Sequence, residues 1–294
     1  MKFNELCKEY ISVKPRSPYS VYSLNRMFTA HVLPYFKEQE IETVDILDAG
    51  RFLFYLKDKT SDRTGKRLAP PTIKSIYQIT TCLFNYAVNR GYIQKNVFRL
   101  LHPRLKDGAK PIRFLTKGQA QKLLQYPFIE KQHKFCVYLA LNAGLRPGEI
   151  RALRWEDIDL KRRMLTIRRT AVFFSGEAFY RPPKNGKPRQ IPINDTLYNF
   201  LVEYKGMHKQ EPTEDILSIS IYFHGWFKRV AADLGIDVSF KDLRKTFGTL
   251  LLMSGTDIFS VSNLLGHSSI KTTEKSYLGL SYVLQKEAVN RLFS

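Results

Sequence analysis

Apolar residues recur at three- and four-residue steps through the first hundred positions, which is the spacing of a buried helix face. Ser17 followed by Pro18 is typical of an N-cap and the first position of a helix. Pro34 should end or kink that helix, and Gly91 should end a longer one that opens near Pro71. With no alternating segment among them, the pattern predicts a bundle of four helices. Three of these helices are carried by Val21, Leu24, Phe28 and Val32; by Ile46, Phe52, Leu53 and Leu56; and by Ile73, Ile76, Ile79, Leu83 and Val88.

The helical pattern lapses between His102 and Phe114, where the sequence reads HPRLKDGAKPIRF. Proline, glycine and basic residues leave this stretch without an apolar face. We therefore predict a helical domain over residues 1–102, a basic linker over 103–113 and a second domain over 114–294.

The second domain combines helices with a short alternating region. Thr116 and Gln119 are placed as a capping box, and a helix through Val137 and Leu139 should stop at Gly144. The period then changes from helical to alternating in MLTIRRTAVFF and AFYRPPKNGKPRQIPI, which predicts strands. Helices are expected again from about Asn194 onward, including Asp242 to Ser254, Asp257 to Leu265, a short helix with Tyr277, and a last amphipathic one from Val283 to Phe293.

An Asn-Gly pair within the second alternating stretch is the strongest short-range signal for a β-hairpin. Asn185 and Gly186 form this pair, and Lys184 comes immediately before it. The expected fold is thus mainly α with a small β-sheet and hairpin.

The composition adds a constraint on size and on the partner. A chain of 294 residues with 44% hydrophobic residues is long enough for two domains with real cores. The net charge of +20 indicates a polyanionic partner, of which nucleic acid is the commonest and an anionic membrane the alternative. No run approaches the ~18 apolar residues that span a bilayer, and the N-terminus lacks the apolar core of a signal peptide. We therefore expect a soluble, cytoplasmic protein.

Both parts of the chain share the positive charge. Before residue 111 there are 19 basic and 10 acidic residues, and the rest of the chain has 28 basic and 17 acidic ones, which gives +9 and +11. Two basic lobes fit a clamp around a DNA duplex better than a single basic tail does.

Cysteine and histidine are too scattered to build a metal site. Cys7, Cys82 and Cys136 lie far apart and outside any CxxC arrangement, so we interpret all three as reduced core residues. The six histidines are dispersed as well. No metal and no other cofactor is expected.

Two arginines stand out because of their apolar neighbours. Arg146 lies on a turn between Gly144 and Pro147, and Arg244 lies near another predicted helix start. Arginines drawn toward partly buried positions need an anion, and two guanidiniums suit one phosphate. Glu149, three residues after Arg146, is placed to orient a cation in the same site. Taken singly, each of these residues is more often an ordinary surface charge.

Three further residues have an ordinary explanation when taken singly. Lys184 beside a turn is commonly a solvent-exposed charge, and His267 after Gly266 is commonly a capping or packing residue. Tyr277 is one of sixteen tyrosines, most of which serve as packing residues. Only the combination of these residues with the two arginines indicates a catalytic site.

Four motifs in this order and spacing resemble the tyrosine recombinase (phage integrase) family. They read AGLRPGEIRALRWEDID, KNGKPRQIPI, KDLRKT and LLGHSSIKTTEKSY. The resemblance covers the whole chain, because the helical N-terminal part is similar to the core-binding domain of that family. It implies a core-binding domain followed by a mixed α/β catalytic domain.

The resemblance also implies a role for each matching residue. Arg146 and Arg244 would grip the scissile phosphate, and Glu149 would support the site. Lys184 would be the general acid toward the leaving 5′ oxygen, while His267 hydrogen-bonds the phosphate. Tyr277 would be the nucleophile that forms a 3′-phosphotyrosyl bond, which another 5′ hydroxyl then resolves.

This sequence departs from the family pattern at two places. Lys241 stands three residues before Arg244, where the family usually has histidine, and lysine there resembles the type IB topoisomerases. Tyr277 comes ten residues after His267, whereas many members have nine. Tyr282 is a weaker alternative nucleophile.

The resemblance implies double-stranded DNA as the partner and a homo-tetramer assembled on it, and it allows accessory DNA-bending proteins. The last helix would dock on a neighbouring protomer or, alternatively, pack on its own domain. A topoisomerase IB-like enzyme that relaxes DNA and a DNA-binding protein with an inactive site remain as alternatives to a site-specific recombinase.

Overall fold

The computed structural model describes residues 1–36, 38–61, 64–101, 112–183, 186–207, 211–217, 221–277 and 289. The chain divides into two compact units, Met1–Ala109 and Lys110–Ser294. Each unit has a hydrophobic core built from its own residues. The linker predicted at 103–113 and the helix predicted from Val283 to Phe293 fall almost wholly outside the described residues, so both stay predictions.

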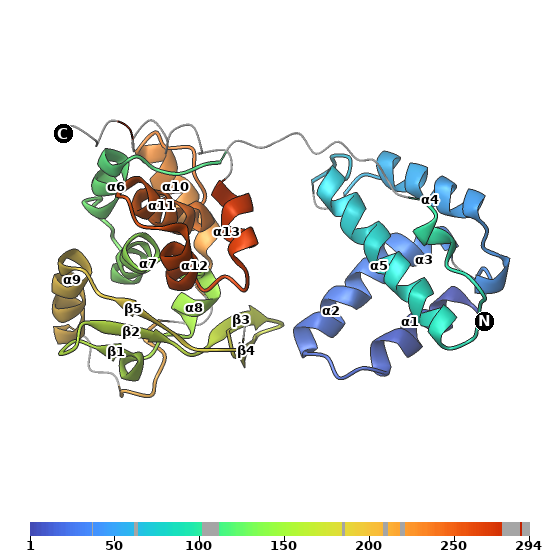
Figure 1. The fold of residues 1–294 in the computed structure, drawn as a ribbon, viewed down its shortest axis with the longest axis horizontal. Helices are drawn as coiled ribbons and strands as arrows, with labels where there is room; N and C mark the ends of the chain where they lie inside the picture. The colour runs from blue at the N-terminus through green and yellow to red at the C-terminus, as the bar shows by residue number, and fades with distance from the viewer. Residues whose placement is uncertain are drawn as a thin grey trace. The chain divides into compact units, whose positions relative to one another are not determined.

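The first unit is the predicted helical bundle (Figure 1). Ser17 caps the second helix as expected, since its side chain accepts a hydrogen bond from the Ser20 amide. The longest helix packs against the first and fourth helices. The elements of this first unit are α1 (Phe3–Ser12), α2 (Pro18–Met27), η1 (Phe28–Val32), α3 (Leu33–Phe36), η2 (Ile41–Thr43), α4 (Ile46–Asp58), α5 (Pro70–Asn89) and η3 (Val97–Arg99).

The interruption expected at Pro34 takes the form of a π-helical turn. In this turn, η1, the amide of Leu33 bonds to the carbonyl of Phe28, five residues earlier. Proline has no amide to donate to a helical ladder, and π turns accommodate such local mismatches. The chain therefore continues into α3 instead of stopping at Pro34.

The second unit is built around α7 (Lys131–Asn142), which packs against α6, α8, α9 and α11. Six residues of α7 are buried on all sides of the helix, which explains its central place. The capping box of Thr116 and Gln119 opens α6 as predicted. The remaining helices are α6 (Lys117–Leu124), α8 (Pro147–Arg151), η4 (Trp155–Asp157), α9 (Asp195–Gly206), α10 (Phe223–Asp233), α11 (Phe240–Met253), α12 (Ile258–Leu265) and α13 (Ile270–Tyr277).

Two small antiparallel sheets complete this unit (Figure 1). The first has the strand order β1 (Ile158–Asp159), β2 (Met164–Ile167), β5 (Arg189–Pro192), with Leu165 opposite Ile191. The second is a ribbon of β3 (Thr170–Phe174) and β4 (Glu177–Arg181). Mainly helical structure with small β-sheets is thus confirmed.

The hairpin predicted around Asn185–Gly186 is wrong in its strands, which do not pair with each other, while Asn185 itself lies outside the described residues. The strand before this pair, β4, pairs with β3, and the strand after it, β5, pairs with β2. Pro182 and Pro183 follow β4 and lack the amides that a ladder needs, so the strand cannot continue to the Asn-Gly pair. The tight hairpin turn lies instead at Ser175 and Gly176, which both have positive φ.

The cysteines are only partly where we expected them. All three are free, and Cys7 and Cys136 are buried in the two cores, but Cys82 is partly exposed on α5.

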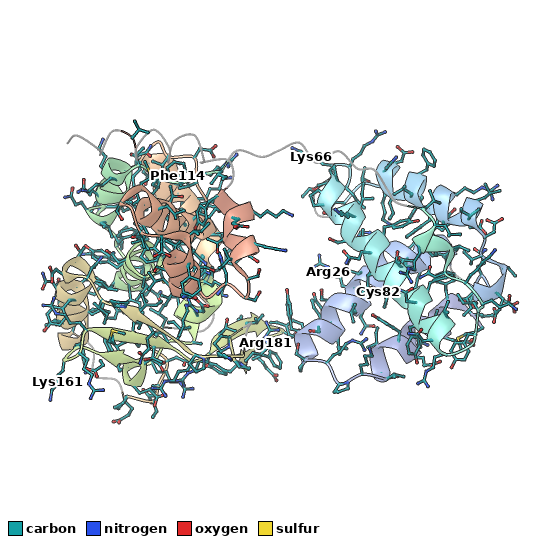
Figure 2. All side chains as sticks on the ribbon, in the orientation of Figure 1. Arg26, Lys66, Cys82, Phe114, Lys161 and Arg181 are labelled. Carbon is teal, nitrogen blue, oxygen red and sulfur yellow. The ribbon has the colours of Figure 1, made fainter. Side chains whose placement is uncertain are left out.

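Within the described parts of the chain, no helix has the length and apolar character that a membrane crossing requires. Side chains cover both units densely, and Lys161 and Arg181 mark the loop after β1 and the end of β4 (Figure 2).

Candidate active site

The buried carboxylate of Glu149 organises a cluster of three arginines in the second unit. Glu149 lies on the first turn of α8 and is 3% exposed. It accepts a hydrogen bond from the Arg146 amide at 2.8 Å and one from the Arg146 guanidinium at 2.8 Å. The Arg244 guanidinium is 3.8 Å away. Glu149 is therefore shared by both predicted phosphate-binding arginines.

A third arginine, Arg189 on β5, holds the same carboxylate more tightly. Its two terminal nitrogens donate to Oε1 and Oε2 of Glu149 at 2.9 Å and 2.7 Å. This is the bidentate geometry in which a guanidinium matches a carboxylate. The Arg189 side chain is 9% exposed, whereas that of Arg146 is 34% exposed. Arg146 consequently presents the more accessible charge.

The three arginines also meet the C-terminal end of α12. Each donates to one of three consecutive backbone carbonyls, which a helix end leaves without intrahelical partners. The pairs are Arg189 Nε with the Leu264 carbonyl at 2.9 Å, Arg244 with the Leu265 carbonyl, and Arg146 with the Gly266 carbonyl at 3.3 Å. Positive charge is favoured at this end of a helix dipole. The residue after this end, His267, is thereby fixed beside the arginine cluster.

The charges of the cluster shift its pKa values. Burial raises the pKa of Glu149, but the hydrogen bonds and charge of Arg189, with the charges of Arg244 and Arg146, outweigh burial and lower it to about 2. Burial and the charge of Arg146 lower the pKa of Arg244 to about 9. At neutral pH the cluster therefore combines three cations with one anion.

His267 is held neutral by this environment. Burial, followed by the charges of Arg244, Arg146 and Arg189, lowers the pKa of its imidazole to about 4. Its Nδ1 atom lies 2.7 Å from the hydroxyl of Thr273, a residue of α13 that is fully buried. A neutral imidazole with one nitrogen engaged has its other nitrogen available for a ligand.

Tyr277 is the last residue of α13 and is 5% exposed. Its ring packs with Phe247, Val261 and Leu265, and its hydroxyl lies directly over Gly248 on α11. A β-carbon at Gly248 would be 2.0 Å from the hydroxyl oxygen, so only glycine leaves room for it there. Burial raises the pKa of Tyr277 to about 12, although the charge of Arg244 lowers it. In this structure the hydroxyl is thus protonated and covered.

Three further predicted site residues, Arg244, Lys241 and Lys184, differ in how far the structure shows their positions. Arg244 lies on the second turn of α11 and not at its start, because the helix begins at Phe240. Lys241 lies three residues earlier on the same helix and is exposed. Lys184 lies outside the described residues, so its predicted place beside the phosphate stays a prediction.

Sequence reasoning missed Arg189, although the motif KNGKPRQIPI contains it. The alternating pattern of β5 was the available signal, because Arg189 pairs with buried Ile167 and lies two residues before buried Ile191. A charged residue in register with buried ones indicates a buried ion pair. The partner, Glu149, is 40 residues away, and only the fold brings the two together.

Comparisons with known proteins cover both units. Residues 113–282 match the phage integrase family. Tyrosine recombinase XerA of Saccharolobus solfataricus is 29% identical over 228 residues, which is 77% of this chain and 72% of the relative. A XerC-like tyrosine recombinase of Caldanaerobacter subterraneus is 25% identical over 256 residues, and the matched region covers 74% of this chain but 64% of that relative.

A solved structure gives the same fold. The integrase of transposon Tn1549, in complex with a circular intermediate DNA, superimposes with a TM-score of 0.83 at 19% identity. The match covers 99% of this chain and 100% of that one. The two-part architecture of a helical unit followed by a mixed α/β unit is therefore a known one.

Proposed function

Because this chain belongs to the phage integrase family, we propose that it is a site-specific DNA recombinase that cuts and rejoins duplex DNA through Tyr277. The observation that carries the proposal is the arginine cluster around Glu149, which adjoins both His267 and Tyr277. A cluster with excess positive charge is suited to a phosphodiester, whose charge increases in the transition state.

In the first step the scissile phosphate binds to Arg146 and Arg244. The free nitrogen of the neutral His267 imidazole donates a hydrogen bond to a phosphate oxygen. The exposed ammonium of Lys241, on the helix that carries Arg244, adds a further cation.

In the second step the Tyr277 oxygen attacks phosphorus. The bond from phosphorus to the 5′ oxygen breaks, Lys184 donates a proton to that oxygen, and the phenolic proton passes to water. Because Tyr277 is 5% exposed and its hydroxyl lies against Gly248, we propose that α13 shifts when DNA binds. Closer approach of the hydroxyl to Arg244 would favour the phenolate.

In the last step a 5′ hydroxyl of another strand attacks the phosphotyrosine and releases Tyr277. The covalent intermediate retains the phosphodiester bond energy, so rejoining needs no ATP. Exchange between two duplexes requires several active sites at once, and we propose a homo-tetramer on DNA. The segment from Val283 to Phe293 is proposed to dock on the next protomer.

Replacing Tyr277 by Phe tests this function, since it removes the attacking oxygen and retains the ring. Duplexes are first selected from a randomised, nicked pool by covalent capture on the unmodified protein. We expect Tyr277→Phe to bind the selected duplex with unchanged affinity and to form no covalent adduct on denaturing gels.

Tyr282→Phe is the matched control, and it should form the adduct at the normal rate. An adduct that persists in Tyr277→Phe and disappears in Tyr282→Phe would move the nucleophile to Tyr282. Failure of the unmodified protein to form any adduct would instead support an inactive DNA-binding protein. Relaxation of plasmids that lack the selected site would favour topoisomerase activity.

A further inference from the structure

The role of Arg189 follows from the number of charges that share one carboxylate. Three guanidiniums surround Glu149, at 2.7 Å for Arg189, 2.8 Å for Arg146 and 3.8 Å for Arg244. Without Arg189, the carboxylate would face only the two arginines assigned to the phosphate and would cancel half of their charge. With Arg189 present, the cluster carries a net charge of two.

Arg189 itself is not placed to bind DNA. Both terminal nitrogens of its guanidinium donate to Glu149, and its Nε donates to the Leu264 carbonyl. The side chain is 9% exposed, and its stem lies against Gly266, where a β-carbon would be 2.7 Å from Arg189 Cδ. Its charge is therefore directed entirely toward groups of the protein.

Arg146 and Arg244 are bound less fully to Glu149, although the Arg244 side chain is only 12% exposed. The Arg146 side chain is 34% exposed and keeps a single guanidinium bond to the carboxylate, at 2.8 Å. Arg244 stands 3.8 Å from the carboxylate and donates to the carbonyls of Gly144 and Leu265 instead. Neither arginine is committed to Glu149 by a bidentate pair, which leaves their charge for an incoming anion.

We propose that Arg189 is a positioning residue that neutralises Glu149, so that Arg146 and Arg244 keep their full charge for the scissile phosphate. The inference rests on the proposed recombinase function. Glu149 is still needed, because it orders three arginines that would otherwise repel each other. Arg189 makes this ordering compatible with binding a phosphate whose negative charge rises during the reaction.

The test combines a single and a double substitution. Arg189→Gln leaves Glu149 to be neutralised by the phosphate-binding arginines, so we expect cleavage of pre-bound DNA to slow on the order of 10²-fold. In Glu149→Gln/Arg189→Gln the carboxylate is absent as well, and the cluster regains its net charge of two. We expect the double variant to recover at least tenfold over Arg189→Gln.

Arg162→Gln is the matched control. It also removes one positive charge, but its side chain is 86% exposed in the loop beside Lys161 (Figure 2). We expect it to cleave pre-bound DNA at the normal rate. Single-turnover adduct formation is measured at saturating protein on the selected nicked duplex, and circular dichroism checks the folding of each variant.

The outcomes separate the inference from the proposed function. Adduct formation by the unmodified protein supports the function, whatever the variants do. A double variant no faster than Arg189→Gln, or a single variant as fast as the control, overturns the role of Arg189. If Arg189→Gln fails to fold, the double variant decides alone: cleavage within about tenfold of normal supports the inference, and loss of folding or of cleavage overturns it.

Discussion

Glu149 shows how one residue can serve stability and chemistry together. Its carboxylate caps the first turn of α8 through the Arg146 amide and also binds three guanidiniums. An ionised carboxylate that is 3% exposed is tolerated only because these partners compensate its lost hydration. Its ionisation is consequently linked to folding.

The acid stability of the protein should report this linkage. The pKa of Glu149 is lowered to about 2 in the folded protein from an ordinary value of 4.5. Its contribution is present above pH 4.5 and is lost as the pH falls toward 2, because the unfolded chain takes up the proton first. That shift corresponds to roughly 3 kcal/mol.

The Glu149→Gln variant has no carboxyl group to titrate at this position, so the unmodified protein is compared with it. We expect the free energy of unfolding of the unmodified protein to fall more steeply between pH 4.5 and 2 than that of the variant, by about 3 kcal/mol over the range. Urea denaturation at several pH values measures the difference. Parallel pH profiles would show that Glu149 is not held ionised by the arginines.

At the scale of elements, the site depends on the turn between α7 and α8, which packs closely against α11 and α12. Gly144 joins α7 to α8, has a φ of +62°, and offers its carbonyl to Arg244 at 2.7 Å. A β-carbon there would be 2.5 Å from Phe247 on α11 and 3.0 Å from Leu265 on α12. Close packing of these three segments sets the place of Arg146, which follows two residues later.

Gly144→Ala should therefore destabilise the second unit. The left-handed backbone costs roughly 1 kcal/mol for alanine, and the overlap with Phe247 adds about 1–3 kcal/mol. Gly118→Ala in α6 is the control, because nothing lies within 4 Å of its β-carbon position and alanine favours a helix. Thermal unfolding should show a clear loss for Gly144→Ala and none for Gly118→Ala. Equal melting temperatures would mean that the turn is not tightly packed.

At the scale of the whole molecule, positive charge is divided between two units that have separate cores. The sequence assigns +9 to residues 1–110 and +11 to residues 111–294, since the two parts hold 19 and 28 basic and 10 and 17 acidic residues. A protein that closes two basic lobes on a duplex neutralises more phosphates than either lobe does alone.

The salt dependence of DNA binding measures how many phosphates each unit neutralises. We expect the affinity of the whole chain for duplex DNA to fall more steeply with salt than that of either fragment, 1–101 or 112–294, since the slope grows by about 0.9 per neutralised phosphate. Fluorescence anisotropy from low to moderate salt gives the slopes, after circular dichroism has shown that each fragment folds. A fragment with the full slope would place all phosphate contacts in one unit.

The helix caps and the family of the protein could be predicted from the amino-acid sequence alone. Ser17 and Thr116 cap helices as predicted, because capping depends on residues three positions apart, and a helix begins after Asn194, where one was expected. The family could be recognised for a similar reason, since the order and spacing of its four motifs are visible without a fold. The basic charge of both parts of the chain likewise needs no coordinates.

Tertiary structure alone decided which residues meet. The Asn-Gly pair predicted a hairpin from local preference, yet β4 and β5 pair with other strands because Pro182 and Pro183 cannot extend the ladder. Arg189 reaches Glu149 and the Leu264 carbonyl only because the fold places β5 beside α8 and α12. The Tyr277 hydroxyl is buried against α11 because residue 248 there is a glycine. Burial and long-range contact set these pKa values and positions, and neither is encoded in the spacing of neighbours along the chain.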